Sequence, residues 1–332
     1  MEIEEKILQG AGIVINDWLQ LPRRAKLLIV TNPEYIQEAK ALEQCAEKRG
    51  ATAHIMMMEN RGIHAGVFFD RHPDIFDGYH TVIGATEYSL VATAAVKRAI
   101  SQGTKFLSLP LCTNDNVSIL AYDFLGMDTQ KSKNMARVII GKIRDSSKIT
   151  VTTALGTDLT LWKRGRNPGF FNGVVKDGKG YSSSSIEMYI PVEEDQTNGL
   201  LVVDGSLGYI GKVAQPIHLT LQKGRIAEIE EHAEGRRLRE YLQSYGDPAM
   251  YIVGEFGIGL NTHAKCRGKC YIEDESSYGT CHFGLGRNLA LGGRHAASGH
   301  FDLVILEPDI FVDNLQIMSR GQITITDGYP YP

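Results

Sequence analysis

"AKLLIVTN", residues 25–32, is a short apolar run that ends in turn residues, which is typical of a buried strand. A segment with helical spacing and a glycine stop follows at 34–50, and "TAHIMMM" at 52–58 is a second strand pattern. The same unit then recurs as a strand pattern at 80–85, a helix pattern at 87–103 and a strand pattern at 105–110. Because strands alternate with helices of this length, the sequence predicts a parallel sheet with crossover helices.

The pattern changes at about residue 148. Residues 148–166 and 216–230 each show the alternation and central turn of a β-hairpin, and 232–246 is the one long helix pattern that remains. The sequence therefore predicts an α/β N-terminal domain with a parallel sheet at 1–147. An α+β metal-binding domain with antiparallel strands is predicted at 148–332.

Composition excludes several classes of partner. The 332 residues carry a formal net charge of −4, and charged residues make up 22% without a long block of one sign. This balance predicts neither a nucleic-acid nor a membrane partner. The acidic start lacks the basic region and apolar core of a signal peptide, and no apolar run approaches the ~20 residues of a membrane span. With five cysteines, an odd number, the sequence predicts a cytoplasmic protein.

Candidate ligands gather near the end of the chain. "GHFDLVI", residues 299–305, places His300 and Asp302 two apart in a strand pattern, so both project from the same face. Glu255 in "VGEFGIGLN" and His282 in "GTCHFGLGRN" lie in similar short, apolar and glycine-rich stretches. Imidazole and carboxylate together suit zinc, manganese, cobalt or iron(II), so the sequence predicts a metal site.

A structural zinc site is the alternative interpretation of this region, which also holds Cys266, Cys270, Cys281 and His263. The C-x3-C spacing is less specific than paired C-x2-C units, and these thiols fit buried, inert positions better. His295 lies in a glycine-rich loop, where it either contacts substrate or has no role in the site.

Several motifs in a fixed order resemble one known family. "GEFGIGLN", "DESSYGTCHFGLGRN" and "GHFDLVI", preceded by "ALGTDLTL", "NGLLVVDGS" and "PIHLTL", resemble the aminopeptidase T and aminopeptidase S family of metal-dependent exopeptidases. The likeness covers most of the chain and is strong from about residue 150 onward. It implies an α/β domain before a catalytic domain that holds two divalent ions, and it implies a homodimer.

The resemblance also implies a ligand set and a reaction. The metal ligands fall on Glu187 in "SIEMYIPV", Glu255, His282, His300 and Asp302. Glu255 and His282 are the predicted catalytic residues, with Glu255 as a ligand or a base. Two ions of the zinc, cobalt or manganese type would activate a water molecule. The function predicted first is therefore a hydrolase that cleaves an N-terminal peptide bond or a small amide bond, with a peptide or small-molecule substrate.

One residue departs from the exopeptidase pattern. Where that family has a catalytic tyrosine, this chain has Leu289, and Tyr251, Tyr271 and Tyr278 are the candidates to replace it. This departure weakens the peptidase prediction.

A second enzyme class shares the scaffold. The 2,5-dihydroxypyridine dioxygenases are similar in fold and in the closing H-x-D, but use one iron(II) held by two histidines and an aspartate. His282, His300 and Asp302 supply these residue types, although those enzymes have a histidine where this chain has Glu255. The alternative function is thus a non-heme iron(II) ring-cleaving dioxygenase acting on a dihydroxypyridine-like or other small aromatic substrate. A metal-binding scaffold without catalysis is a third interpretation, disfavoured because unused buried charges cost free energy.

Overall fold

The computed structural model describes residues 2–59, 62, 65–177 and 180–325. The chain forms two compact units, each described by itself. Unit 1 comprises residues 1–129 and 171–185, and unit 2 comprises 130–170 and 186–332.

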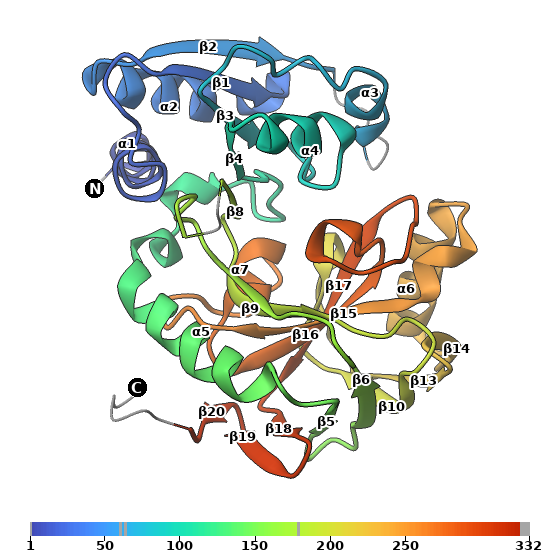
Figure 1. Ribbon diagram of the computed structural model, residues 1–332. Helices are drawn as coiled ribbons and strands as arrows, with labels where there is room; N and C mark the ends of the chain where they lie inside the picture. Colours follow the sequence, from blue (N-terminus) through green and yellow to red (C-terminus); the bar gives the residue numbers. More distant parts are fainter. Residues whose placement is uncertain (1, 60–61, 63–64, 178–179, 326–332) are drawn as a thin grey trace. The chain divides into compact units, whose positions relative to one another are not determined.

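Unit 1 contains a parallel sheet with the strand order β2-β1-β3-β4-β8 (Figure 1). The apolar runs that form β1, β3 and β4 are buried on both faces of the sheet, whereas β2 is partly exposed. The first four strands were predicted, whereas the short polar β8 was not. The strands are β1 (Lys26–Thr31), β2 (Thr52–Met57), β3 (Thr81–Ala85), β4 (Lys105–Ser108) and β8 (Tyr181–Ser183).

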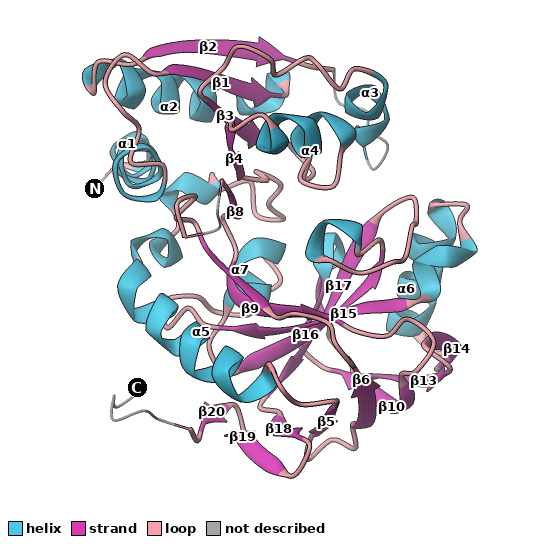
Figure 2. Ribbon diagram, viewed as in Figure 1, coloured by secondary structure: helices cyan, strands magenta, loops and turns pink. Residues whose placement is uncertain are grey.

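Helices connect the strands of unit 1 (Figure 2). The helix predicted at 87–103 begins only at Ala94, because the side chain of Thr93 accepts a hydrogen bond from the Val96 N–H and caps it there. Phe69, Phe76 and Phe106 are fully buried in one core cluster. The helical segments are α1 (Ile3–Ile13), η1 (Val14–Trp18), η2 (Pro33–Tyr35), α2 (Ile36–Lys48), α3 (Gly66–Arg71), α4 (Ala94–Ser101), η4 (Ile119–Ala121) and η5 (Asp123–Gly126).

Unit 2 is built on two antiparallel sheets. One has the order β14-β13-β10-β6-β5-β18-β19-β20, and the other β12-β11-β17-β16-β15-β9-β7. Both predicted hairpins form: β5 pairs with β6, and β13 pairs with β14. The strands are β5 (Lys148–Thr152), β6 (Asp158–Trp162), β7 (Gly169–Asn172), β9 (Ile186–Pro191), β10 (Asn198–Val203), β11 (Ser206–Leu207), β12 (Gly211–Lys212), β13 (Ile217–Gln222), β14 (Arg225–Ile229), β15 (Val253–Gly259), β16 (Thr280–Gly286), β17 (His300–Leu306), β18 (Asp309–Val312), β19 (Leu315–Ser319) and β20 (Gln322–Ile323).

The helices of unit 2 include the predicted one at 232–246, which forms as α6. Short α7 contacts β9, β15, β16 and β17, the strands that carry the candidate ligands. The helical segments are α5 (Thr129–Ile143), which starts at the unit boundary, α6 (Ala233–Ser244), α7 (Tyr271–Ser276), η6 (Gly208–Ile210), η7 (Pro248–Tyr251) and η8 (Leu289–Leu291).

The predicted fold class is confirmed: a parallel-sheet α/β part is followed by an α+β part with antiparallel strands. The division at 147/148 stays a prediction, and residues 1 and 326–332 of the predicted domains lie outside the described residues. Among the helices that the structure describes, none is both long enough and apolar enough to cross a membrane.

Candidate metal centre

The five predicted ligands project from one face of one sheet. They lie on β9, β15, β16 and β17, which are antiparallel neighbours (Figure 1). Residues paired across two strands share a face, and so do residues two apart within a strand. Each ligand is paired with a glycine on a neighbouring strand. The pairs are Glu187 with Gly259, Glu255 with Gly284, His282 with Gly257, His300 with Gly286 and Asp302 with Gly284.

These glycines provide the space that the side chains occupy. A Cβ atom at Gly257 would lie 2.0 Å from Nε2 of His282. At Gly284 it would lie 2.6 Å from Cε1 of His300 and 2.8 Å from Cβ of Glu255. All three distances are far shorter than a van der Waals contact, so the G-x-G spacing in β15 and β16 is what lets the ligands converge.

The side chains form two groups that share Glu255. In one group, Glu187, Glu255 and His282 offer ligand atoms that all lie within 4.8 Å of one another, and Glu255, His300 and Asp302 do so in the other. Nε2 of His282 lies 2.8 Å from Oε2 of Glu187. Nε2 of His300 lies 3.0 Å from Oε2 of Glu255 and 3.2 Å from Oδ1 of Asp302.

Exposure differs among the ligands. Glu187, Glu255, His282 and Asp302 are all buried. The side chain of His300 is 33% exposed. A small molecule would therefore reach these groups from the side of His300.

Burial and mutual charge shift the pKa values of the site in opposite directions. Burial lowers the pKa of His282, but the carboxylates of Glu187, Asp302 and Glu255 together raise it, to about 9. The pKa of His300 is likewise opposed by burial and raised well above its usual value by Asp302 and Glu255. Burial raises the pKa of Glu255, whereas His300 lowers that of Asp302 despite its burial. In the metal-free protein both imidazoles therefore carry a positive charge that offsets part of the negative charge.

Glu275 is a site residue that the sequence analysis missed. It is buried on α7, and its carboxyl group hydrogen-bonds to Asp302. Burial raises the pKa of Glu275 well above the usual value, and the neighbouring carboxylates Glu187 and Asp302 raise it further. This shift favours the protonated form of Glu275, which can donate to Asp302. A helix of six residues leaves too little periodicity for the sequence to show that this acid points inward.

Of the two imidazoles, only one has a hydrogen bond to another described residue at Nδ1, the ring nitrogen away from the site. Nδ1 of His300 donates to the backbone carbonyl of Arg287 at 2.9 Å, which leaves Nε2 for a metal. Nδ1 of His282 is buried and has no hydrogen-bond partner among the described residues.

The other candidates from the sequence lie outside both groups. Nε2 of His295 donates to the carbonyl of Ala249 at 2.9 Å. Among the described residues, no cysteine joins a cluster with the geometry of a metal site. Cys270 and Cys281 are buried, Cys266 is half-buried, and His263 is exposed.

The contacts of the candidate tyrosines with other described residues do not involve Leu289, which is 43% exposed in η8. The ring of Tyr251 lies beneath the guanidinium of Arg225, and the hydroxyl of Tyr278 accepts from the backbone of Ile323. Tyr271, on α7, has its ring centroid 4.3 Å from that of Tyr209, with the two rings tilted by 52°.

The donor set fits a divalent metal. Several buried carboxyl groups converge with two imidazoles on one face of the sheet, and such an excess of buried negative charge is costly without a compensating cation. Imidazole nitrogen and carboxylate oxygen are ligands that zinc, manganese and iron(II) accept.

Comparison with known proteins shows the family. The family model described as 2,5-dihydroxypyridine 5,6-dioxygenase matches residues 74–325, which is more than half of the chain. The chain belongs to this dioxygenase family. A 2,5-dihydroxypyridine 5,6-dioxygenase from Pseudomonas putida KT2440 is 28% identical over 142 residues. That alignment spans 39% of this chain and 40% of the relative's length, which is less than half of each.

Two solved structures share the fold of this chain. The 2,5-dihydroxypyridine dioxygenase from P. putida KT2440 superposes with a TM-score of 0.79 at 17% identity, covering 98% of each chain. AmpT from Thermus thermophilus superposes with a TM-score of 0.67 at 12% identity, covering 98% of this chain and 100% of its own. At these identities the likeness concerns the fold alone.

The predicted aminopeptidase-like hydrolase is wrong. The family match and the P. putida relative both carry the name of the dioxygenase, which the sequence analysis held only as the alternative. The motifs misled because AmpT and the P. putida dioxygenase share the fold of this chain, so motif order and spacing report the fold before the reaction.

Proposed function

We propose that this protein is an iron(II)-dependent dioxygenase that opens the ring of a dihydroxypyridine or a similar small dihydroxylated aromatic compound. The observation that carries the proposal is the buried convergence of Glu255, His300 and Asp302, with His300 on the exposed side, in a chain of the dioxygenase family. Non-heme iron(II) oxygenases hold the metal through a few imidazole and carboxylate ligands on one side and leave other positions open.

We assign the iron to the group of Glu255, His300 and Asp302. This donor set has one imidazole and two carboxylates. The set of His282, His300 and Asp302 predicted for an iron site instead takes residues from both groups. Glu275 donates to Asp302 and so holds that carboxylate in one orientation.

Bound iron(II) supplies the activation of dioxygen toward an electron-rich ring. The protein binds and orients the ring beside His300, where the site is exposed, while the buried carboxylates keep bulk water from the other side. Nε2 of His282 lies 2.8 Å from Oε2 of Glu187, next to Glu255. We propose this pair as an acid and base for the hydroxyl protons of a bound substrate.

The test begins with metal content and oxygen uptake. Protein purified without oxygen and without chelators should contain about one iron per chain. It should consume dioxygen in a 1:1 ratio with 2,5-dihydroxypyridine, followed with an oxygen electrode and by loss of the ring's absorbance. No oxygen uptake by the iron-loaded protein, across a panel of dihydroxylated pyridines and benzenes, would refute the proposal.

A matched pair of histidine variants tests the site. His300→Ala should lose iron and oxygen uptake, because it removes a ligand atom. His263→Ala should keep both, because His263 is exposed and lies outside both groups. The predicted homodimer and the predicted cytoplasmic location stay predictions, and sedimentation of the purified protein tests the first.

A further inference from the structure

The loop of residues 287–299 joins the strand of His282 to the strand of His300. It leaves β16 at Arg287, contains η8 and reaches β17 after Gly299. Any displacement of this β16–β17 loop therefore acts on the end of the strand that begins with a ligand.

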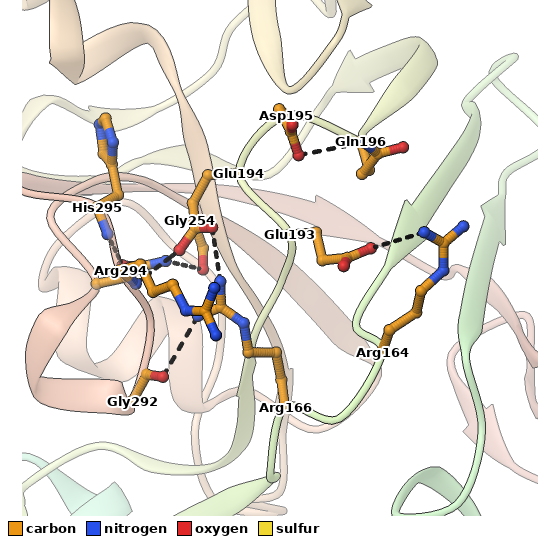
Figure 3. A network of polar contacts seen from close by, with 11 residues as sticks. Arg164, Arg166, Glu193, Glu194, Asp195, Gln196, Gly254, Gly292, Arg294 and His295 are labelled. Atoms are coloured by element: carbon orange, nitrogen blue, oxygen red, sulfur yellow. Dashed lines mark hydrogen bonds and ion pairs between the residues drawn. The ribbon is translucent and has the colours of Figure 1, made fainter.

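Glu194 fixes this loop from a part of the chain distant in sequence (Figure 3). Its Oε2 accepts from Nη2 of Arg166 at 2.7 Å. Its Oε1 accepts from Nδ2 of Asn288 at 2.9 Å. The same oxygen accepts from the backbone N–H of Arg294 at 2.8 Å. The side chains of Arg166 and Glu194 are only 11% and 18% exposed, so solvent screens this ion pair little. Glu194 thus binds both ends of the loop's central turn.

Asn288 carries the contact from Glu194 to the metal centre. Its Nδ2 also donates to the carbonyl of Gly254, the residue before Glu255, at 2.9 Å. Its Oδ1 accepts from the backbone N–H of His295 at 2.8 Å. A Cβ at Gly293 would lie 2.1 Å from the side chain of Asn288, so the loop is shaped around this buried amide.

Arg287 completes the connection to His300. Its backbone N–H donates to the carbonyl of Gly299 at 2.8 Å, and its own carbonyl accepts from Nδ1 of His300 at 2.9 Å. The peptide that orients the imidazole is therefore the one that precedes Asn288, the residue held by Glu194.

We propose that Glu194 is a positioning residue for the metal centre. Through Asn288 it holds the carbonyl of Arg287 where this carbonyl fixes the ring of His300, with Nε2 directed toward Glu255 and Asp302. The proposal rests on the metal site of the proposed function. It adds that the loop network, and not only the strand, sets the geometry of the one partly exposed ligand.

The adjacent residue supplies a matched control. Glu193 pairs with Arg164 at 3.7 Å, and their side chains are 24% and 55% exposed (Figure 3). Glu193→Gln removes the same charge at the next position without touching the loop. Glu194→Gln keeps the side-chain volume, so folding is retained, and Asn288→Ala breaks the same connection at its next step.

The first measurement uses metal-free protein with 15N-labelled histidine. The Nδ1–H signal of His300, assigned by its loss in His300→Gln, should be protected from exchange with water in the wild type and in Glu193→Gln. Glu194→Gln and Asn288→Ala should shift this signal and speed its exchange. An unchanged signal in both variants would overturn the proposal.

The second measurement is Co(II) affinity, followed by the visible absorption of the bound ion. Loss of a partner that orients a ligand typically weakens metal binding about 10- to 100-fold, so we expect at least about a 10-fold loss for Glu194→Gln and none for Glu193→Gln. A shifted His300 signal with unchanged affinity would overturn the role toward the metal. If wild-type protein binds no metal, the proposed function fails, and the histidine signal still decides whether Glu194 positions His300.

Discussion

Gly284 lies between Glu255 on one neighbouring strand and Asp302 on the other. A side chain at this position would occupy the volume in which the two carboxylates and His300 meet. The site therefore depends as much on where the sequence omits a side chain as on where it places a ligand.

Gly284→Ala should abolish tight iron binding, because the added methyl group displaces Glu255 and His300. Overpacking of this kind should also lower the free energy of unfolding by about 1–3 kcal/mol. Gly141→Ala is the control, since Gly141 is exposed on α5 and its new Cβ meets no atom within 4 Å. It should stabilise the protein by about 0.5–1 kcal/mol through helix propensity. Iron titration and urea unfolding measure both effects, and equal iron affinity in the two variants would contradict the prediction.

Asp274, next to Glu275, makes the free energy of unfolding depend on pH. Burial raises the pKa of Asp274 to about 6, although the N–H groups of Arg267 and Gly268 donate to it and lower it. The folded state then binds this proton more tightly than the unfolded state. Stability is highest below the unfolded pKa of about 4 and falls as the pH rises through about 6.

Asp274→Asn should remove this pH dependence while keeping the acceptor oxygen. Urea unfolding with a chelator present measures the free energy of unfolding of both proteins. Between pH 4 and pH 7, the value for the variant minus that for the wild type should rise by on the order of 2 kcal/mol. A constant difference between the two proteins across this range would show that Asp274 ionises normally in the folded state.

How far the sequence predicts the site depends on local spacing. His300 and Asp302 are two apart in a strand, so their common face follows from the period of the strand. Glu187 is brought to Gly259 only by the pairing of β9 with β15, which no local pattern shows. Without the family resemblance its position in the site would not have been predicted. Glu275 was missed because a helix of six residues shows too little periodicity to reveal which side it buries.

At the scale of the element, β17 divides its two faces between binding and packing. His300 and Asp302 project toward the metal centre, while the fully buried Phe301 projects to the other side, where its ring lies 4.6 Å from that of Tyr241. The strand therefore holds its ligands in place by burying the residue between them.

Phe301→Leu should lower the free energy of unfolding by about 1 kcal/mol, because it leaves part of the aromatic volume unfilled. It should keep about one iron per chain, since no ligand atom is lost. Metal analysis and urea unfolding of Phe301→Leu and of His300→Ala show whether packing on one face of β17 and metal binding on the other are independent. Loss of iron in Phe301→Leu would mean that the two faces of the strand are not independent.

β8 is one element that the sequence missed. It has three residues, and its pairing with β4 comes from the fold rather than from any apolar pattern of its own. β15 and β16 have seven residues each, but the sequence showed them only as apolar, glycine-rich stretches. β1 to β4, β17 and α6 were predicted because each shows its pattern over several residues. Period alone gave no sign that residues 171–185 return to the parallel sheet.

At the scale of the whole molecule, unit 1 is discontinuous in sequence. Residues 171–185 supply β8 and also cover Trp18, which is fully buried. The N–H of Val175 donates to the carbonyl of Trp18 at 3.1 Å, and a Cβ at Gly173 would lie 2.2 Å from the indole. A contiguous fragment 1–147 would lack this cover and would carry the whole of α5, which belongs to unit 2 from Gln130 onward.

This difference makes the predicted boundary at 147/148 testable. Residues 1–129 can be joined to 171–185 by a short linker, because Nδ2 of Asn172 lies 3.2 Å from the carbonyl oxygen of Thr129. Trp18 is the single tryptophan in this joined chain and in fragment 1–147. The joined chain should show blue, quenching-resistant fluorescence and cooperative unfolding. Fragment 1–147 should emit at longer wavelength and bind a hydrophobic dye, because the edge of β4 and the indole are uncovered. If fragment 1–147 instead shows the same emission and the same unfolding midpoint, segment 171–185 adds nothing to the stability of unit 1, and the contiguous boundary is the better description of how this chain folds.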